Sequence, residues 1–291
     1  MAKDSNIISC GMTDLLFPVE VKDNEVRTNS EYSKIVSGIV DGEEMHLNYC
    51  SPRYELVENK AIFPNVENVL KANGIGFKAS YRHVNHVRFY ADLIINDDKF
   101  KFDVSGSGDI IRPKISVQHS YNGLTKYMIN FGYFRMICSN GLVIPVEEMN
   151  MFNLSISGKH TSSILRSIER LNEMLVFFSQ NASTIIPQIT GKFETLGGHW
   201  VANPQDRIEE VMKVSGLSII DNSKFNTVND IMNRIETEAN DPAMNYNGKV
   251  NDWLIYNGIN QYINDENRTI EVPEKRREKD SKVLETLLAT V

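Results

Sequence analysis

The chain has 291 residues, of which 41% are hydrophobic and 24% charged, and its formal net charge is −7. This composition is typical of a soluble globular protein with one large domain or two ordinary ones, and it differs from collagen-like and disordered chains. No apolar run approaches the roughly 18 to 20 residues of a membrane helix, and the first residues lack a secretory signal pattern, so we expect a cytoplasmic protein without membrane contact.

The first part of the chain shows weak structural signals. Residues 1–40 are polar, and we expect an irregular N-terminal arm there. An extended segment follows over 46–57, where Pro52 favours an edge strand or an entry loop. Residues 63–73 then predict a short helix, because apolar residues recur at helical spacing and Asn73 and the glycine after it supply a stop.

The next segments predict β-structure. Apolar and polar residues alternate with a period of two over 86–95, which is typical of a strand with one buried face. After a turn at 96–98 we expect a return strand over 99–103, and further strands over 112–118 and 126–137. Strands joined by short turns indicate an antiparallel sheet with one packed helix.

Beyond residue 157 the apolar period changes to that of a helix. A helix of about 20 residues should begin near Ile164. Further helices are expected over 204–216, 228–235 and 253–263, then a charged linker over 271–280 and a terminal helix over 283–288. The sequence therefore predicts an α+β fold: an irregular N-terminal arm (1–40), an antiparallel sheet core with one helix (41–156) and a mainly helical C-terminal region (157–291).

No motif for catalysis or metal binding stands out. The run from Ser105 to Asp109 is rich in glycine but lacks the Lys-Ser/Thr of a phosphate-binding loop, so we expect a flexible hairpin tip. His83 and His86 would lie on opposite faces of a strand and could not chelate one ion. The three cysteines are far apart, which argues against disulfides and structural zinc, and Cys138 is best explained as a buried thiol. We predict no catalytic residue, no metal and no cofactor.

Residues 71–140 carry ten Lys/Arg against five Asp/Glu, a local charge of +5, so the rest of the chain amounts to −12. The same window contains five of the 11 Tyr and six of the 13 Phe. Basic side chains interleaved with aromatic rings suit single-stranded nucleic acid, which offers phosphates and unpaired bases. The alternative is a half-buried sheet whose basic residues only solvate its outer face.

Strand alternation places a set of basic residues and one tyrosine on one side of the predicted sheet. The candidate nucleic-acid-binding residues are Arg88, Tyr90, Lys99, Lys101, Arg112, Lys114, Lys126 and Arg135, and Lys78 and Arg82 could extend them. This set depends on the register, because a slip of one residue would move every side chain to the other face.

Three stretches together resemble a known family. Arg53-Tyr54, the run from Arg135 to Leu142 and the run from Trp253 to Tyr262 are similar to motifs of the phage/plasmid-like family known as domain of unknown function 932. The sequence departs from the family at 118–123, where a usual aspartate is replaced. The resemblance implies a gene of phages, prophages or plasmids, with no settled activity, and some such proteins look distantly similar to phage single-strand annealing proteins.

Together these observations favour a nucleic-acid-binding protein of a phage or mobile element that acts in the cytoplasm of a bacterial host. We expect it to bind single-stranded DNA through a basic sheet surface, and an annealing role in recombination would involve a homo-oligomer. The second hypothesis is an interaction protein, not an enzyme, whose acidic helical region counteracts a host defence or restriction system. A cysteine-dependent or nuclease-like enzyme is the third.

Overall fold

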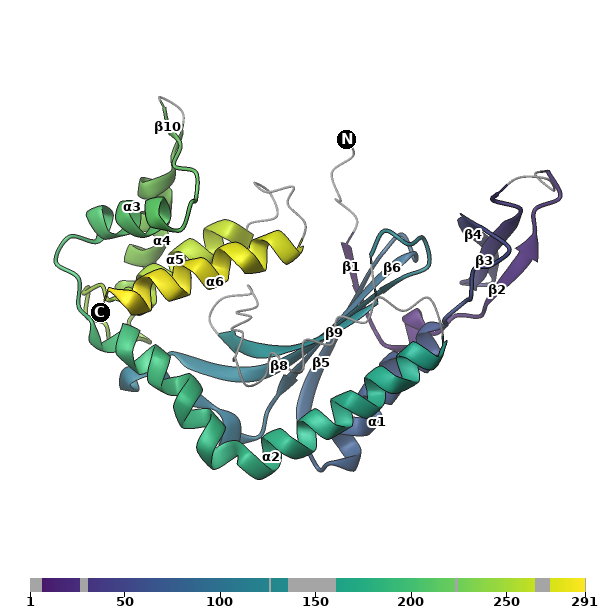
Figure 1. Ribbon diagram of the computed structural model, residues 1–291, viewed down its shortest axis with the longest axis horizontal. Helices are drawn as coiled ribbons and strands as arrows, with labels where there is room; N and C mark the ends of the chain where they lie inside the picture. Colours follow the sequence, from purple (N-terminus) through teal and green to yellow (C-terminus); the bar gives the residue numbers. More distant parts are fainter. Residues whose placement is uncertain are drawn as a thin grey trace. The chain divides into compact units, whose positions relative to one another are not determined.

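The computed structural model describes residues 7–26, 31–125, 127–135, 161–222, 225–264 and 273–290 (Figure 1). The chain forms two compact units. The first unit holds residues up to Asp98, Pro113–Phe131 and the following chain from Glu147 to Gln180, and the second holds Lys99–Arg112, Gly132–Val146 and Asn181–Val291. Antiparallel sheets with a packed helix precede a mainly helical C-terminal region, so the predicted α+β class is confirmed.

The larger sheet has the strand order β1-β5-β6-β8-β7, and β9 also pairs with β8. The pairs with a described register are antiparallel. Its strands are β1 (Ile7–Cys10), β5 (Phe77–Val84), β6 (Arg88–Ile95), β7 (Phe102–Asp103), β8 (Ile110–Ser120) and β9 (Met128–Arg135). The strands expected over 86–95 and 112–118 are confirmed as β6 and β8.

One face of this sheet forms the core of the first unit. Phe89 and the apolar residues that alternate with the polar ones along β6 are fully buried, as predicted. Helix α1 (Phe63–Ala72) packs on this face, with the rings of Phe63 and Tyr81 at 6.2 Å. The start of α2 (Thr161–Gly198) lies on the same side, since the hydroxyls of Tyr127 and Ser167 are 2.6 Å apart. The polar residues of β6, which alternate with the buried ones, therefore lie on the opposite face of the sheet.

The expectation of an irregular N-terminal arm is wrong. Three strands, β2 (Val19–Asp23), β3 (Lys34–Val40) and β4 (Glu43–Cys50), form a separate antiparallel sheet. Asp41 and Gly42 both have a positive φ and connect β3 to β4. An Asp-Gly pair is a strong signal for a two-residue hairpin, because both residues tolerate this backbone conformation.

The expected return strand over 99–103 is also wrong. A 3-10 turn occupies Asp98–Phe100, and β7 has only two residues, which pair with Ile110 and Ile111 of β8. The long partner of β6 is instead β8, from Lys114 to Ser120. The segment 99–103 has only five residues before the glycine-rich turn, which is too few to pair along the eight residues of β6. The more distant β8 therefore pairs with β6. Further 3-10 turns occupy Thr13–Leu15, Asn59–Ala61 and Val104–Gly106.

The glycine-rich loop connects β7 to β8 at the tip of a hairpin, as predicted, and hydrogen bonds link it to α2. The backbone N–H and the hydroxyl of Ser105 donate to the two carboxylate oxygens of Glu194, at 3.0 and 2.9 Å. Asp109, at the end of the loop, is fully buried and accepts hydrogen bonds from the indole of Trp253 at 2.7 Å and the hydroxyl of Tyr246 at 3.1 Å.

Four of the described helices after residue 160 begin near the predicted positions, but α2 is longer than expected and α6 begins earlier. The structure has α2, α3 (Pro204–Val214), α4 (Thr227–Ala239), α5 (Asp252–Asn264) and α6 (Pro273–Ala289), with a small hairpin of β10 (Asp221–Asn222) and β11 (Phe225–Asn226). Helix α2 has 38 residues, instead of the expected length of about 20.

The charged linker expected over 271–280 is helical from Pro273 onward. Proline suits the first turn of a helix, and the Glu, Lys and Arg residues after it have high helix propensity. The later apolar residues of α6 are buried, including Val283 and Leu287. The charged segment and the terminal helix are therefore one element.

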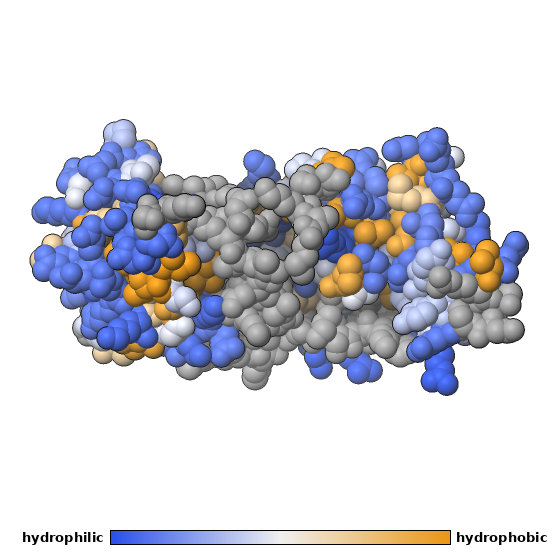
Figure 2. Space-filling view, turned by 90° about the horizontal axis from the view of Figure 1, so that it is seen from above, coloured by the Kyte–Doolittle hydropathy of each residue, from blue (hydrophilic) through white to orange (hydrophobic). Residues whose placement is uncertain are grey.

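The described helices do not resemble membrane spans, because none of them combines sufficient length with sufficient apolar character. On the face shown in Figure 2, hydrophilic residues predominate and hydrophobic residues form smaller patches among them.

Candidate nucleic-acid interface

The polar face of the larger sheet brings together residues from three strands of the first unit. We define the basic sheet face by the residues that face the same way in the register of β5, β6 and β8: Lys78, Ser80, Arg82, Val84, Arg88, Tyr90, Asp92, Ile94, Lys114, Ser116, Gln118 and Ser120. Residues directly opposite one another on neighbouring strands project to the same side. Four basic and one acidic side chain give this face a formal charge of +3.

A tight turn between β5 and β6 sets this register. Asn85 and His86 both have a positive φ, at 50° and 55°, and the N–H of Val87 donates to the carbonyl of Val84 at 3.1 Å. Three residues, Asn85 to Val87, connect the two strands, and the positive φ of the first two lets the chain reverse direction within this short loop. Val84 then pairs with Arg88, and all later pairs follow.

Asp92 is the centre of a polar cluster on this face. Its carboxylate lies 2.6 Å from Nη2 of Arg82 and accepts a hydrogen bond of 2.6 Å from the hydroxyl of Ser116. Nζ of Lys114 lies 3.5 Å from the same carboxylate. The cluster thus connects β5, β6 and β8, and it holds two basic groups in fixed positions.

Lys114 was expected on the exposed face of the sheet, but its side chain is buried. Its side chain is only 9% exposed, and burial lowers the pKa of its ammonium group although Asp92 opposes this effect. Lys114 lies on an interior strand, because β8 pairs with β6 and with β9. The more accessible basic residues of the face are Lys78, which is exposed, Arg82, with 41% of its side chain exposed, and the half-buried Arg88.

Other predicted residues are not part of this face in the described unit. Lys99, Lys101 and Arg112 belong to the second unit, and Lys99 places Nζ 4.6 Å from the ring centre of Phe100. Lys126 lies outside the described residues. The side chain of Arg135, the last residue of β9, lies outside them too, as does Cys138.

The two histidines near the turn are closer than the sequence suggested. The rings of His83 and His86 stack with their centres 4.0 Å apart, so the expectation of opposite faces is wrong. His86 belongs to the turn and not to a strand, and strand alternation does not apply to it. In the part of the chain that the structure describes, no three His, Cys, Asp or Glu residues are grouped as metal ligands would be.

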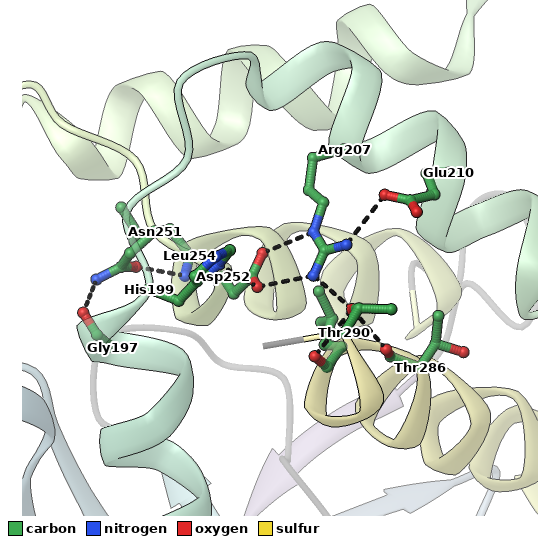
Figure 3. A network of polar contacts seen from close by, with 10 residues as sticks. Gly197, His199, Arg207, Glu210, Asn251, Asp252, Leu254, Thr286 and Thr290 are labelled. Carbon is green, nitrogen blue, oxygen red and sulfur yellow. Dashed lines mark hydrogen bonds and ion pairs between the residues drawn. The ribbon is translucent and has the colours of Figure 1, made fainter.

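A second polar network lies in the second unit, and none of its residues was predicted as a site residue (Figure 3). Asp252 is fully buried at the start of α5, and Arg207 donates to both of its oxygens at 3.0 and 2.9 Å. His199 places Nδ1 2.8 Å from the same carboxylate. Arg207 also donates to Thr290, which directly follows α6, at 2.7 Å. The network connects α3, α5 and α6, which is a structural role.

The sequence contains only a weak indication of this network. Asp252 precedes an apolar helix, where an acidic residue is common in the first turn whatever its partners are. The hydrogen bonds with Asp252 raise the pKa of Arg207, because they stabilise its charged form.

Comparison with known proteins identifies a family but no individual relative. The family model described as Domain of unknown function (DUF932) matches residues 46–286. No curated protein and no solved structure matches the chain.

Proposed function

The chain belongs to the DUF932 family, and we propose that it is a nucleic-acid-binding protein of a phage or mobile element that binds single-stranded DNA through the basic sheet face. The observation that carries this proposal is the cross-strand register. It gathers Lys78, Arg82 and Arg88 on one face with Tyr90. The single acidic residue of that face, Asp92, is already paired.

The balance of charge sets how such binding should behave. The chain as a whole carries −7, so long-range attraction to phosphate is weak. Affinity must come from local contacts on the basic sheet face, and each phosphate contact releases counterions. Binding should therefore weaken steeply as salt rises.

A fluorescence titration with a labelled single-stranded oligonucleotide across a salt series tests the proposal. Lys78→Ala with Arg88→Ala should weaken binding and reduce the salt slope by about 0.7 for each phosphate contact removed. The matched control is Lys60→Ala with Lys213→Ala, which removes the same charge from two exposed residues outside the face. The control should bind almost as the parent does.

Two results would contradict the proposal. The parent could fail to bind at low salt, or the control pair could lose as much affinity as the variant of the basic sheet face. Either result would favour the interaction-protein hypothesis. Annealing by a homo-oligomer is an extension of the proposal, and accelerated pairing of complementary strands would support it.

A further inference from the structure

We propose that Arg82, Tyr90 and Gln118 form a binding site for one unpaired nucleotide, whose base stacks on Tyr90. This inference rests on the proposed function and adds the residue that distinguishes single strands from duplexes. We call these three residues the nucleotide row. They lie in one line across β5, β6 and β8, because Tyr90 pairs with Arg82 on one side and with Gln118 on the other.

The row has the dimensions of one nucleotide. Neighbouring strands lie about 4.8 Å apart, so the row spans roughly 10 Å across the three strands. Side chains that are directly opposite have their Cβ atoms about 5 Å apart and project to the same side. A guanidinium, an aromatic ring and a carboxamide therefore lie next to one another on the basic sheet face.

Each member supplies a different interaction. The ring of Tyr90 offers a flat π-face, on which any base can stack. The amide of Gln118 has both donors and an acceptor for a base edge. The guanidinium of Arg82 suits a phosphate oxygen. In a duplex the faces of the bases are already stacked, so only the phosphate contact would survive.

The contacts of Arg82 and Tyr90 within the first unit fit this role. Nη2 of Arg82 donates to the carboxylate of Asp92 at 2.6 Å. No described residue accepts a hydrogen bond from Nη1, which is the atom that we assign to the phosphate. Fixing the guanidinium in advance reduces the entropy lost on binding. Tyr90 is half-buried, and its hydroxyl has no hydrogen-bond partner among the described residues.

The experiment compares two labelled ligands of equal length, an oligothymidylate and an abasic deoxyribose-phosphate chain, at one low salt concentration. The parent should bind the abasic chain about tenfold more weakly, which is typical of losing a stacked base. Tyr90→Phe keeps the ring and should keep this difference. Tyr90→Leu and Tyr90→Val should bind both ligands as the parent binds the abasic chain.

The outcomes separate this inference from the proposed function. If the parent binds both ligands equally well, the nucleotide row is wrong while nucleic-acid binding stands. If the parent binds neither ligand, the proposed function fails and the row with it. If Tyr90→Leu and Tyr90→Val retain the tenfold difference, the base does not stack on Tyr90. Valine is included because it suits a strand, and melting temperatures verify that each variant is folded.

Discussion

Neighbouring residues on β6 have opposite roles, because the side chains of a strand alternate between its faces. Arg88 lies on the basic sheet face, whereas Phe89 is fully buried on the other side. The ring of Phe89 lies 5.0 Å from that of Tyr121 and 6.1 Å from that of Phe17. One side chain lies on the polar face of the sheet, and the other contributes to the core.

Phe89→Ala should lower the free energy of unfolding by about 3 to 5 kcal/mol, because it removes a buried ring and leaves a cavity. Urea denaturation followed by circular dichroism measures this. Lys78→Ala, on an exposed residue of the adjacent strand, is the control and should change stability by less than about 0.5 kcal/mol. Similar losses in the two variants would show that Phe89 is not a core residue.

Arg207 makes two ion pairs whose surroundings differ. Its partner Asp252 is fully buried, whereas 55% of the side chain of Glu210, its other partner, is exposed. A buried charge that loses its partner is costly, while an exposed pair contributes little.

Arg207→Ala should therefore lower the free energy of unfolding by about 3 to 5 kcal/mol, since among the described residues it leaves Asp252 with only His199 as a side-chain partner. Glu210→Ala is the matched control and should cost no more than about 1 kcal/mol. Thermal or chemical denaturation of the two variants gives the comparison. Equal and small losses of unfolding free energy in the two variants would mean that the buried pair does not stabilise the second unit.

At the scale of elements, α6 docks on α5 through a buried carboxylate. Asp280 of α6 accepts hydrogen bonds from the Tyr256 hydroxyl at 3.1 Å and from the Asn260 amide at 2.6 Å. Burial raises the pKa of Asp280 from 3.8 to about 6, although both hydrogen bonds act in the opposite direction. The folded protein therefore binds this proton more tightly than the unfolded chain does.

The contribution of this group to stability should be present below pH about 4 and should be lost as the pH rises through about 6. Asp280→Asn cannot ionise, so relative to the parent it should gain stability between these values, by at most about 3 kcal/mol at neutral pH. Urea denaturation at pH 4, 5, 6 and 7 follows this difference. Glu278→Gln, on an exposed residue of the same helix, should show no such trend. If the difference in unfolding free energy between Asp280→Asn and the parent stayed constant from pH 4 to 7, the raised pKa of Asp280 would be contradicted.

At the scale of the whole molecule, the positively charged segment of the sequence does not coincide with one structural unit. The sequence concentrates +5 in residues 71–140, but the two units share these residues, with Lys99, Lys101 and Arg112 in one and the basic sheet face in the other. The face in the first unit still carries +3, so its positive charge does not require the whole window. Salt dependence is the property that reports on it.

The sequence by itself determined the elements whose signals are local. The alternation along β6 predicted its buried face, and the helices α1 and α3, which have a proline in the first turn and end near glycines, lie where the sequence predicts them. These patterns depend on backbone propensities and on the solvation of neighbouring side chains, which a short segment contains in full.

Only the tertiary structure decided which residues lose contact with water and which strands pair. Lys114 is buried because β8 has partners on both sides, and Asp280 is buried because α5 covers it, although each lies in a charged segment. The partner of β6 was the distant β8 and not the nearest segment. Burial and pairing depend on residues far apart in the chain, so no local pattern specifies them.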